Sequence, residues 1–290
     1  MRSVSFLTKL DFQNRGILIL DLLGNFLRLS PQFKGKRFLL KYWCDNPPSP
    51  LNRIAALPNG AKCRIDLRTP YEQMVWLQRE EWNDLVALLD LMETGSLLID
   101  IGANIGLWTL VGATKGEVIA VEPNPRTYQM LVENIKLNGV GEKVTAIHAA
   151  VASELGEVSF NCQAEHNLSS IDNTNQSDVR VSAITLDSLF TSKISTKGLV
   201  IKMDTEGYEM AALLGASKTL LVRNLKLIIE FNTTLLESKV LNDWSVYEHL
   251  RNHGFDAFQF PNRGLVKLPS DFSVSGYTNI LFARKTELHG

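Results

Sequence analysis

The sequence is poor in cysteine and has no excess of charge of either sign. Its cysteines, Cys44, Cys63 and Cys162, form no C-x-x-C pair, which disfavours both a disulfide framework and a zinc site. The formal net charge of −1 gives no global electrostatic reason to bind nucleic acid or anionic lipid. We therefore expect reduced thiols, a cytoplasmic protein and no nucleic-acid partner.

Long hydrophobic runs are also absent. The first residues contain no compact apolar stretch followed by a small-residue cleavage site, so we expect no secretory signal. The one candidate membrane stretch, residues 16–29, is about fourteen residues long and is interrupted by polar side chains. Because a helix that spans a bilayer needs about 20 apolar residues, we expect no transmembrane segment.

Residues 16–29 instead predict an amphipathic helix. Their polar residues, Asp21, Asn25 and Arg28, are spaced i, i+4 and i+7 and so share one helix face. We expect the apolar side to pack on the rest of the protein or on a second copy of the chain, which would make a homo-oligomer. Attachment to a membrane surface is the alternative, and four basic residues between positions 34 and 41 keep it open.

A proline-rich stretch over 45–50 marks a boundary, because it suits neither a helix nor a central strand. We expect an extension over 1–60 and one domain over 61–290. With 45% hydrophobic and 21% charged residues, the chain can bury a full core.

The larger part of the chain alternates in an α/β rhythm. Near-continuous apolar runs predict five strands, near 97–101, 117–122, 144–148, 199–204 and 226–231. Such runs are typical of strands buried on both faces, as in a parallel sheet covered by helices. The fold class is therefore α/β, with a doubly wound sheet.

Residues 100–106, with the sequence DIGANIG, follow the first of these strands and precede a helix-like stretch. Gly102 and Gly106 remove side chains from the approach of a ligand, and the helix that follows offers backbone N–H groups. A dinucleotide site prefers G-x-G-x-x-G, whereas here Asn104 occupies the middle position. The spacing argues against NAD and is closer to the loop of S-adenosylmethionine (SAM) methyltransferases; a plain packing turn is the alternative.

A carboxylate at the end of the second strand supports a nucleotide-type ligand. Glu122 lies 20 residues beyond Gly102, in the sequence VEPNP. At that place a carboxylate can accept both hydroxyls of an adenosine ribose. The alternative for Glu122 is a solvated surface position.

Several sequence blocks occur in order along the chain. They are LIDIGANIG (98–106), VEPNP (121–125), ENIKLN (133–138), TLDSL (185–189), IKMDTEGYE (201–209), GA (215–216) and IIE (228–230). In this set the chain resembles the FkbM-type SAM-dependent methyltransferases. Residues 1 to about 60 lie outside the resemblance.

The resemblance implies a class I methyltransferase: a seven-stranded, Rossmann-like sheet closed by an antiparallel edge pair over 255–260 and 278–284, and SAM as cofactor. It also implies O-methylation of a hydroxyl on a natural-product, polyketide or glycan acceptor. The residues expected to bind SAM are Asp100, Gly102, Asn104, Gly106, Glu122, Asn124 and Ala150.

The chemistry is expected where residues 202–209 leave the fourth strand, because open α/β sheets bind ligands beyond the carboxyl ends of their strands. Methyl transfer mainly needs alignment of the acceptor, but a positioned base also helps a hydroxyl to react. Asp204 and Glu206 are the candidates, with His166 in the loop over 164–170 as another. The alternative for Asp204 is an N-cap of the following helix.

Lys202 lies inside the fourth strand, where an unpaired ammonium is costly. A strand order of 3-2-1-4-5 would place Asp100 and Glu230 on the two neighbouring strands, so we expect an acid–lysine–acid cluster. Asp204, Glu230 and Asn232 would alternatively form a cation site, but Lys202 disfavours it and we expect no metal. The alternative functions are an NAD-dependent reductase and a catalytically silent binding module.

Overall fold

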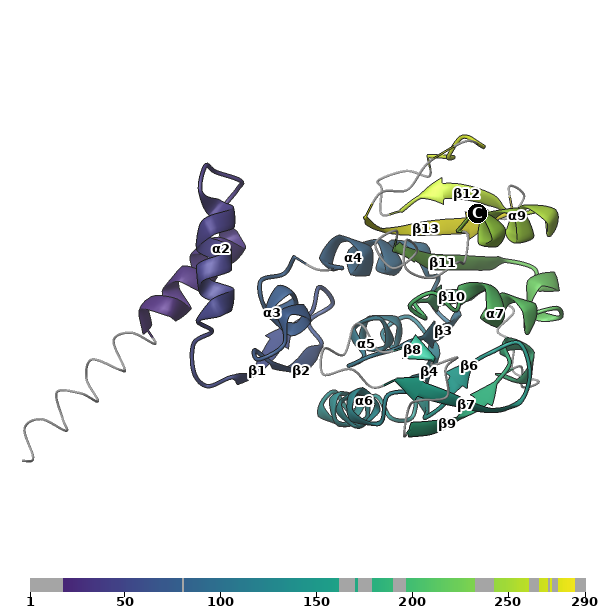
Figure 1. Cartoon of the computed structure of the whole chain (residues 1–290), viewed down its shortest axis with the longest axis horizontal. Helices are drawn as coiled ribbons and strands as arrows, with labels where there is room; N and C mark the ends of the chain where they lie inside the picture. Colours follow the sequence, from purple (N-terminus) through teal and green to yellow (C-terminus); the bar gives the residue numbers. More distant parts are fainter. Residues whose placement is uncertain are drawn as a thin grey trace, which may run out of the picture. The chain divides into compact units, whose positions relative to one another are not determined.

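The computed structural model describes residues 18–79, 81–161, 170–171, 179–189, 197–232, 243–260, 266–270, 272 and 276–284. The chain divides into two compact units (Figure 1). The first comprises Met1–Ala55 and Arg64–Trp82, and the second Ala56–Cys63 and Asn83–Gly290. The expected division at residue 60 stays a prediction.

The first unit begins with two helices, over 18–29 and α2 (Lys36–Asp45), so the predicted helix is confirmed. Trp43 is fully buried, and its Nε1 donates a hydrogen bond of 2.8 Å to the carbonyl oxygen of Leu20. A Cβ at Gly24 would lie 2.7 Å from that nitrogen, so glycine allows the close approach. These contacts hold the two helices together.

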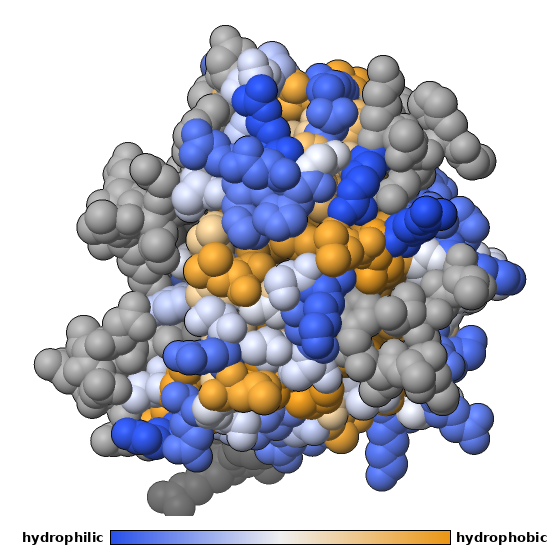
Figure 2. Space-filling view, turned by 90° about the vertical axis from the view of Figure 1, so that its right-hand side faces the viewer, coloured by the Kyte–Doolittle hydropathy of each residue, from blue (hydrophilic) through white to orange (hydrophobic). Residues whose placement is uncertain are grey.

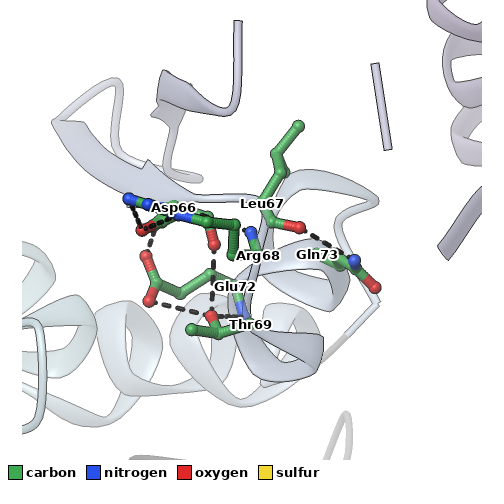
Figure 3. A network of polar contacts seen from close by, with 6 residues as sticks. All are labelled: Asp66, Leu67, Arg68, Thr69, Glu72 and Gln73. Carbon is green, nitrogen blue, oxygen red and sulfur yellow. Dashed lines mark hydrogen bonds and ion pairs between the residues drawn. The ribbon is translucent and has the colours of Figure 1, made fainter. Parts of the chain in front are cut away.

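A buried polar network fixes the turn into α3 (Pro70–Trp76), as Figure 3 shows. Thr69 is the N-cap, and its hydroxyl lies 2.9 Å from Oε1 of Glu72. The same carboxylate accepts a hydrogen bond from the backbone N–H of Asp66, whose own carboxylate pairs with Arg68. Thr-x-x-Glu is the spacing of a capping box. Near this turn, β1 (Asn52–Ala56) and β2 (Lys62–Asp66) form a two-stranded sheet.

The second unit is built on a seven-stranded sheet in the order β12-β13-β11-β10-β3-β4-β5 (Figure 1). The strands are β3 (Leu97–Ile101), β4 (Glu117–Val121), β5 (Val144–Ile147), β10 (Leu199–Met203), β11 (Leu225–Asn232), β12 (Asp256–Gln259) and β13 (Tyr277–Ala283). The five parallel strands are β3, β4, β5, β10 and β11, and β13 runs antiparallel to both β11 and β12. The predicted α/β class, the order 3-2-1-4-5 and the antiparallel edge pair are confirmed. All five residues of β10 are buried, as a strand covered on both faces requires.

Helices and a smaller sheet complete the second unit. The helices are α4 (Trp82–Leu91), α5 (Leu107–Gly112), α6 (Pro125–Leu137), α7 (Glu209–Leu214) and α9 (Asp243–Asn252), with short 3-10 turns η2 (Leu186–Leu189) and η3 (Thr219–Leu221). The smaller sheet has the order β6-β9-β7-β8, made of β6 (Ala150–Val151), β7 (Gly156–Asn161), β8 (Ser170–Ile171) and β9 (Val179–Ile184). His166 lies outside the described residues.

Asp187 in the TLDSL block ties η2 to the segment that follows α7. Its carboxylate accepts hydrogen bonds from the backbone N–H groups of Lys218 and Thr219 and from the hydroxyls of Ser217 and Thr219. Partial burial alone would raise the pKa of Asp187, but these hydrogen bonds outweigh it and hold the pKa below its usual value. This block therefore supports the fold.

Replacing Asp187 by asparagine should lower the free energy of unfolding by about 1–2 kcal/mol. The side chain loses its charge, and its NH₂ group would face the backbone N–H and hydroxyl groups that now donate to the carboxylate. Denaturant titration measures the change. Asp90→Asn, at an exposed position of α4, is the matched control and should unfold like the wild type. Equal destabilisation by both variants would contradict the anchoring role.

Candidate active site

The loop over 102–106 is fixed to the end of β4. The backbone N–H groups of Gly102 and Ala103 donate to the carbonyl oxygen of Val121 at 2.9 and 3.0 Å. The N–H of Asn104 donates to Oε2 of Glu122 at 2.7 Å. The loop is therefore held in one conformation by main-chain hydrogen bonds to the neighbouring strand.

Gly102 is required by a backbone contact between distant parts of the chain. Its φ is +74°, and a Cβ there would lie 1.9 Å from the carbonyl oxygen of Asp204. The N–H of Asp204 in turn donates to the carbonyl oxygen of Ile101 at 3.0 Å. Gly102 thus makes room for the chain after β10, and its expected contact with a ligand stays a prediction.

Asn104 has a left-handed backbone with φ of +50°, a conformation that asparagine tolerates better than most residues. Its Oδ1 is buried and accepts no hydrogen bond within the described part of the chain. A buried acceptor without a donor is costly. This atom therefore marks a place where the donor of a bound molecule fits.

Glu122 is buried, so the solvated alternative for it is wrong. Besides Asn104, its carboxylate accepts hydrogen bonds of 2.8 Å from the N–H of Asn124 and from the hydroxyl of Thr127, both on Oε1. A carboxylate offers about four acceptor positions, so capacity is left on Oε2. Burial raises the pKa of Glu122 to about 7, against the opposite effect of the three hydrogen bonds.

Of three other residues expected to bind the cofactor, two accept hydrogen bonds from within the protein and one is buried in a strand. Asn124 is the N-cap of α6 and accepts a hydrogen bond from the N–H of Arg126 at 3.0 Å. Asp100 is buried and accepts a hydrogen bond of 2.6 Å from the hydroxyl of Thr109, and its burial raises its pKa to about 6. Ala150 is buried in β6. Contact of these residues with a cofactor stays a prediction.

Gly106, the last of the loop glycines, begins α5. It is the N-cap of that helix and has a φ of +98°. A Cβ at Gly106 would lie 2.7 Å from Cδ1 of Leu131 in α6. Its place is thus set by helix packing, and any cofactor contact again stays a prediction.

Lys202 lies in a buried acidic cluster with Glu230, as expected, but its second ion pair is with Asp204 and not with Asp100. Its side chain is 2% exposed, and its Nζ lies 3.7 Å from Oδ2 of Asp204 and 3.8 Å from Oε2 of Glu230. Asp100 is its register partner on β3. The ring of Trp108 lies 5.2 Å from the same ammonium. A cation bound between the Asp204 and Glu230 carboxylates would meet this positive charge at close range.

Asp204 does not cap a helix, so that alternative is wrong. Helix α7 starts at Glu209, its N-cap is Tyr208, and no side chain makes a cap hydrogen bond there. The carboxylate of Glu209 instead accepts hydrogen bonds from the backbone N–H groups of Thr205 and Gly207. The side chain of Asp204 is 25% exposed, which leaves it accessible to an acceptor.

The other two candidate bases are Glu206 and His166. Glu206, in the same segment as Asp204, is half-buried and has a left-handed backbone with φ of +53°. His166 lies outside the described residues, so its role as a second base stays a prediction.

Sequence reasoning missed some residues that support the site. Asn134 is fully buried and donates from Nδ2 to the carbonyl oxygen of Ile105 at 2.9 Å, which fixes the loop from α6. Trp108 and Thr109, which contact Lys202 and Asp100, read as ordinary helix residues. The only signal in the sequence was that Asn134 lies in the ENIKLN block, which is part of the family resemblance.

The chain is similar to known methyltransferases. It is 29% identical over 170 residues to the hexuronic acid methyltransferase AglP of Haloferax volcanii, a match that covers 56% of this chain and 67% of AglP. Among solved structures, it is similar to TYW2 of P. horikoshii in complex with MeSAdo, with 16% identity, a TM-score of 0.41 and coverage of 81% of this chain and 71% of that chain. The precorrin-6y C5,15-methyltransferase of Geobacter metallireducens is 15% identical, with a TM-score of 0.42 and coverage of 71% and 89%.

Residues 100–257 match the methyltransferase FkbM domain family. The matched region is more than half of the chain and includes the loop over 102–106, Glu122 and the Lys202 cluster. The chain therefore belongs to the FkbM family of SAM-dependent methyltransferases.

Proposed function

We propose that this methyltransferase transfers a methyl group from SAM to an oxygen of a glycan, with a hexuronic acid as the acceptor class. The observation that carries the proposal is the contact between Gly102 and Asp204. It brings the cofactor loop and a partly exposed carboxylate to the same end of β3 and β10. A donor held by the loop and an acceptor held by Asp204 would meet there.

The loop offers two features that suit SAM. The buried Oδ1 of Asn104 can accept a hydrogen bond from the ammonium group of the methionine part. The remaining acceptor capacity of Glu122 suits a ribose hydroxyl. SAM supplies an electrophilic methyl group on a sulfonium, so the protein mainly orients the acceptor and excludes water.

Asp204 is the proposed base. A hydroxyl is a poor nucleophile, and removal of its proton by a positioned carboxylate contributes about 10²- to 10⁴-fold to the rate. The ammonium of Lys202 lies 3.7 Å from Oδ2 of Asp204 and holds this side chain at the end of β10. Asp204 would accept the proton as the methyl group moves to the oxygen.

The acceptor class is supported by the relative AglP, whose name gives hexuronic acid as its substrate. Polyketide and other natural-product acceptors were the broader expectation from the sequence. The base role of Asp204 applies to a sugar hydroxyl, whereas an ionised sugar carboxylate carries no proton to remove and would need only orientation. The cytoplasmic location, the homo-oligomer and the absence of nucleic-acid partners stay predictions.

Incubation of the purified chain with methyl-labelled SAM and a panel of glycans tests the function. We expect label in glycans that carry hexuronic acids and little in matched glycans that carry hexoses. Label that survives mild alkali identifies an ether, whereas a methyl ester is hydrolysed. Equal labelling of both sets would contradict the hexuronic acid class, and calorimetric binding of NADH in place of SAM would contradict the cofactor.

SAM affinity should depend on pH through Glu122. Ribose hydroxyls donate to the ionised carboxylate, so binding lowers its pKa from about 7 and affinity falls as the pH drops below that value. The loss should approach about tenfold per pH unit. In Glu122→Gln the affinity should be weaker and nearly constant from about pH 6.5 to 8. Calorimetry with S-adenosylhomocysteine gives both curves, and the same slope in the variant would contradict the assignment.

Asp204→Asn should reduce kcat by about 10²-fold or more and leave SAM affinity unchanged, because an amide cannot accept the proton. Glu206→Gln tests the other candidate base in the same segment and should retain most activity if Asp204 is the base. Full turnover by Asp204→Asn would transfer the role to Glu206 or His166. Loss of wild-type activity with EDTA and recovery with magnesium would instead indicate a cation held by Asp204 and Glu230.

A further inference from the structure

The first two helices described by the structure, within residues 18–45, carry an exposed apolar face; we call them the N-terminal hairpin. On the first helix, five large apolar side chains are 53–76% exposed: Leu18, Ile19, Leu22, Phe26 and Leu29. At 100° per residue these positions fall within an arc of about 100°. The sequence predicted that this side packs on the rest of the protein or on a second copy of the chain; within one chain these five side chains are exposed.

Aromatic residues beside the first helix and on α2 are also exposed. Phe33, which follows the first helix, is 38% exposed, and its ring centroid lies 5.6 Å from that of Phe26. On α2, Phe38 and Tyr42 are 74% and 50% exposed and are spaced one helical turn apart. Large aromatic and aliphatic side chains on one side of a short helix are typical of helices that lie in a membrane interface.

Exposed apolar residues alone do not identify a docking surface. Figure 2 shows a face of the molecule where hydrophobic residues also reach the surface, bordered by hydrophilic ones. In the second unit, Leu155 and Leu221 are 68% and 75% exposed. The hairpin differs because its apolar residues share one helix face and are accompanied by positive charge.

The positive charge is concentrated at this end of the sequence. Residues 1–45 contain eight basic and three acidic residues, although the whole chain has a net charge of −1, so the remainder is acidic. In the hairpin, Lys34 and Arg37 are exposed, and Lys41 is exposed but pairs with Asp45 at 3.1 Å. Asp21, an acidic residue of the first helix, is neutralised by Arg53 at 2.6 Å. The N-terminal region is therefore basic, although the net charge of the whole chain is close to zero.

The hairpin is held together independently of any partner. Trp43 and Leu27 are fully buried, and Trp43 donates to the carbonyl oxygen of Leu20. Lys36 donates to the carbonyl oxygens of Ser30 and Pro31, at the end of the first helix. The apolar face is therefore presented on a preformed support, which lowers the ordering cost of docking.

We propose that the N-terminal hairpin docks the protein on the surface of an anionic lipid bilayer, with its apolar face in the headgroup region and its cations beside the lipid charges. Basic residues near an anionic bilayer are attracted to it, whereas two hairpins placed face to face would bring like charges together. Within the described residues, no helix is long and apolar enough to cross a membrane. The proposal does not rest on the proposed function.

Vesicle flotation with the full-length chain tests the proposal. We expect the protein to float with phosphatidylcholine vesicles that contain phosphatidylglycerol, and to float much less with phosphatidylcholine alone or at about 0.5 M salt. Leu22→Ser/Phe26→Ser should lower the partition coefficient at least about tenfold. Lys34→Glu/Arg37→Glu should do the same on anionic vesicles only. These positions are exposed, so the variants should keep the melting temperature of the wild type.

Leu155→Ser/Leu221→Ser is the matched control, since it removes equally exposed apolar residues from the second unit, and it should float like the wild type. Three results would overturn the proposal: no flotation of the wild type, equal flotation of all variants, or a dimer in gel filtration that Leu22→Ser/Phe26→Ser dissociates without any vesicle binding. The last result would show that a second copy of the chain covers the face.

Discussion

One buried carboxylate joins three parts of the candidate site. Glu122 accepts hydrogen bonds from the loop residue Asn104, from the backbone of the α6 N-cap Asn124, and from Thr127 inside α6. The end of β4, the loop after β3 and the start of α6 are therefore fixed relative to one another by a single group. Burial makes this carboxylate costly to ionise, and the three donated hydrogen bonds offset part of that cost. The acceptor capacity that remains on Oε2 is available to a bound molecule.

A second buried charge organises the neighbouring part of the sheet. Lys202 lies within the core of β10, where only compensation by acidic groups makes an ammonium tolerable. Asp204 and Glu230 supply that compensation from the ends of adjacent strands. The same arrangement keeps a partly exposed carboxylate at the edge of the sheet, beside the loop that Glu122 holds. Structural stability and the proposed chemistry thus use the same ion pairs.

The sheet and the Lys202 cluster could be predicted from sequence because both follow from burial. Continuous apolar runs indicate parallel strands, and a lysine in such a run requires an acidic neighbour. Contacts between distant residues could not be predicted: nothing in the sequence places the carbonyl of Asp204 against Gly102. An asparagine at position 124 suits a ligand contact and a helix cap equally well, so the sequence alone does not choose between them. Periodicity groups the apolar residues of the first helix on one face but does not show what covers that face.

The contact between Gly102 and Asp204 also bears on attempts to engineer this enzyme. The two chain segments lie so close that neither backbone has room to move without the other. Libraries that place a side chain at position 102 to change acceptor preference would displace the Asp204 backbone, so the acceptor side and the methyl-donor side would be disturbed together. Diversity is better placed on the smaller sheet, where β7 and β9 pair with each other and hold none of these contacts.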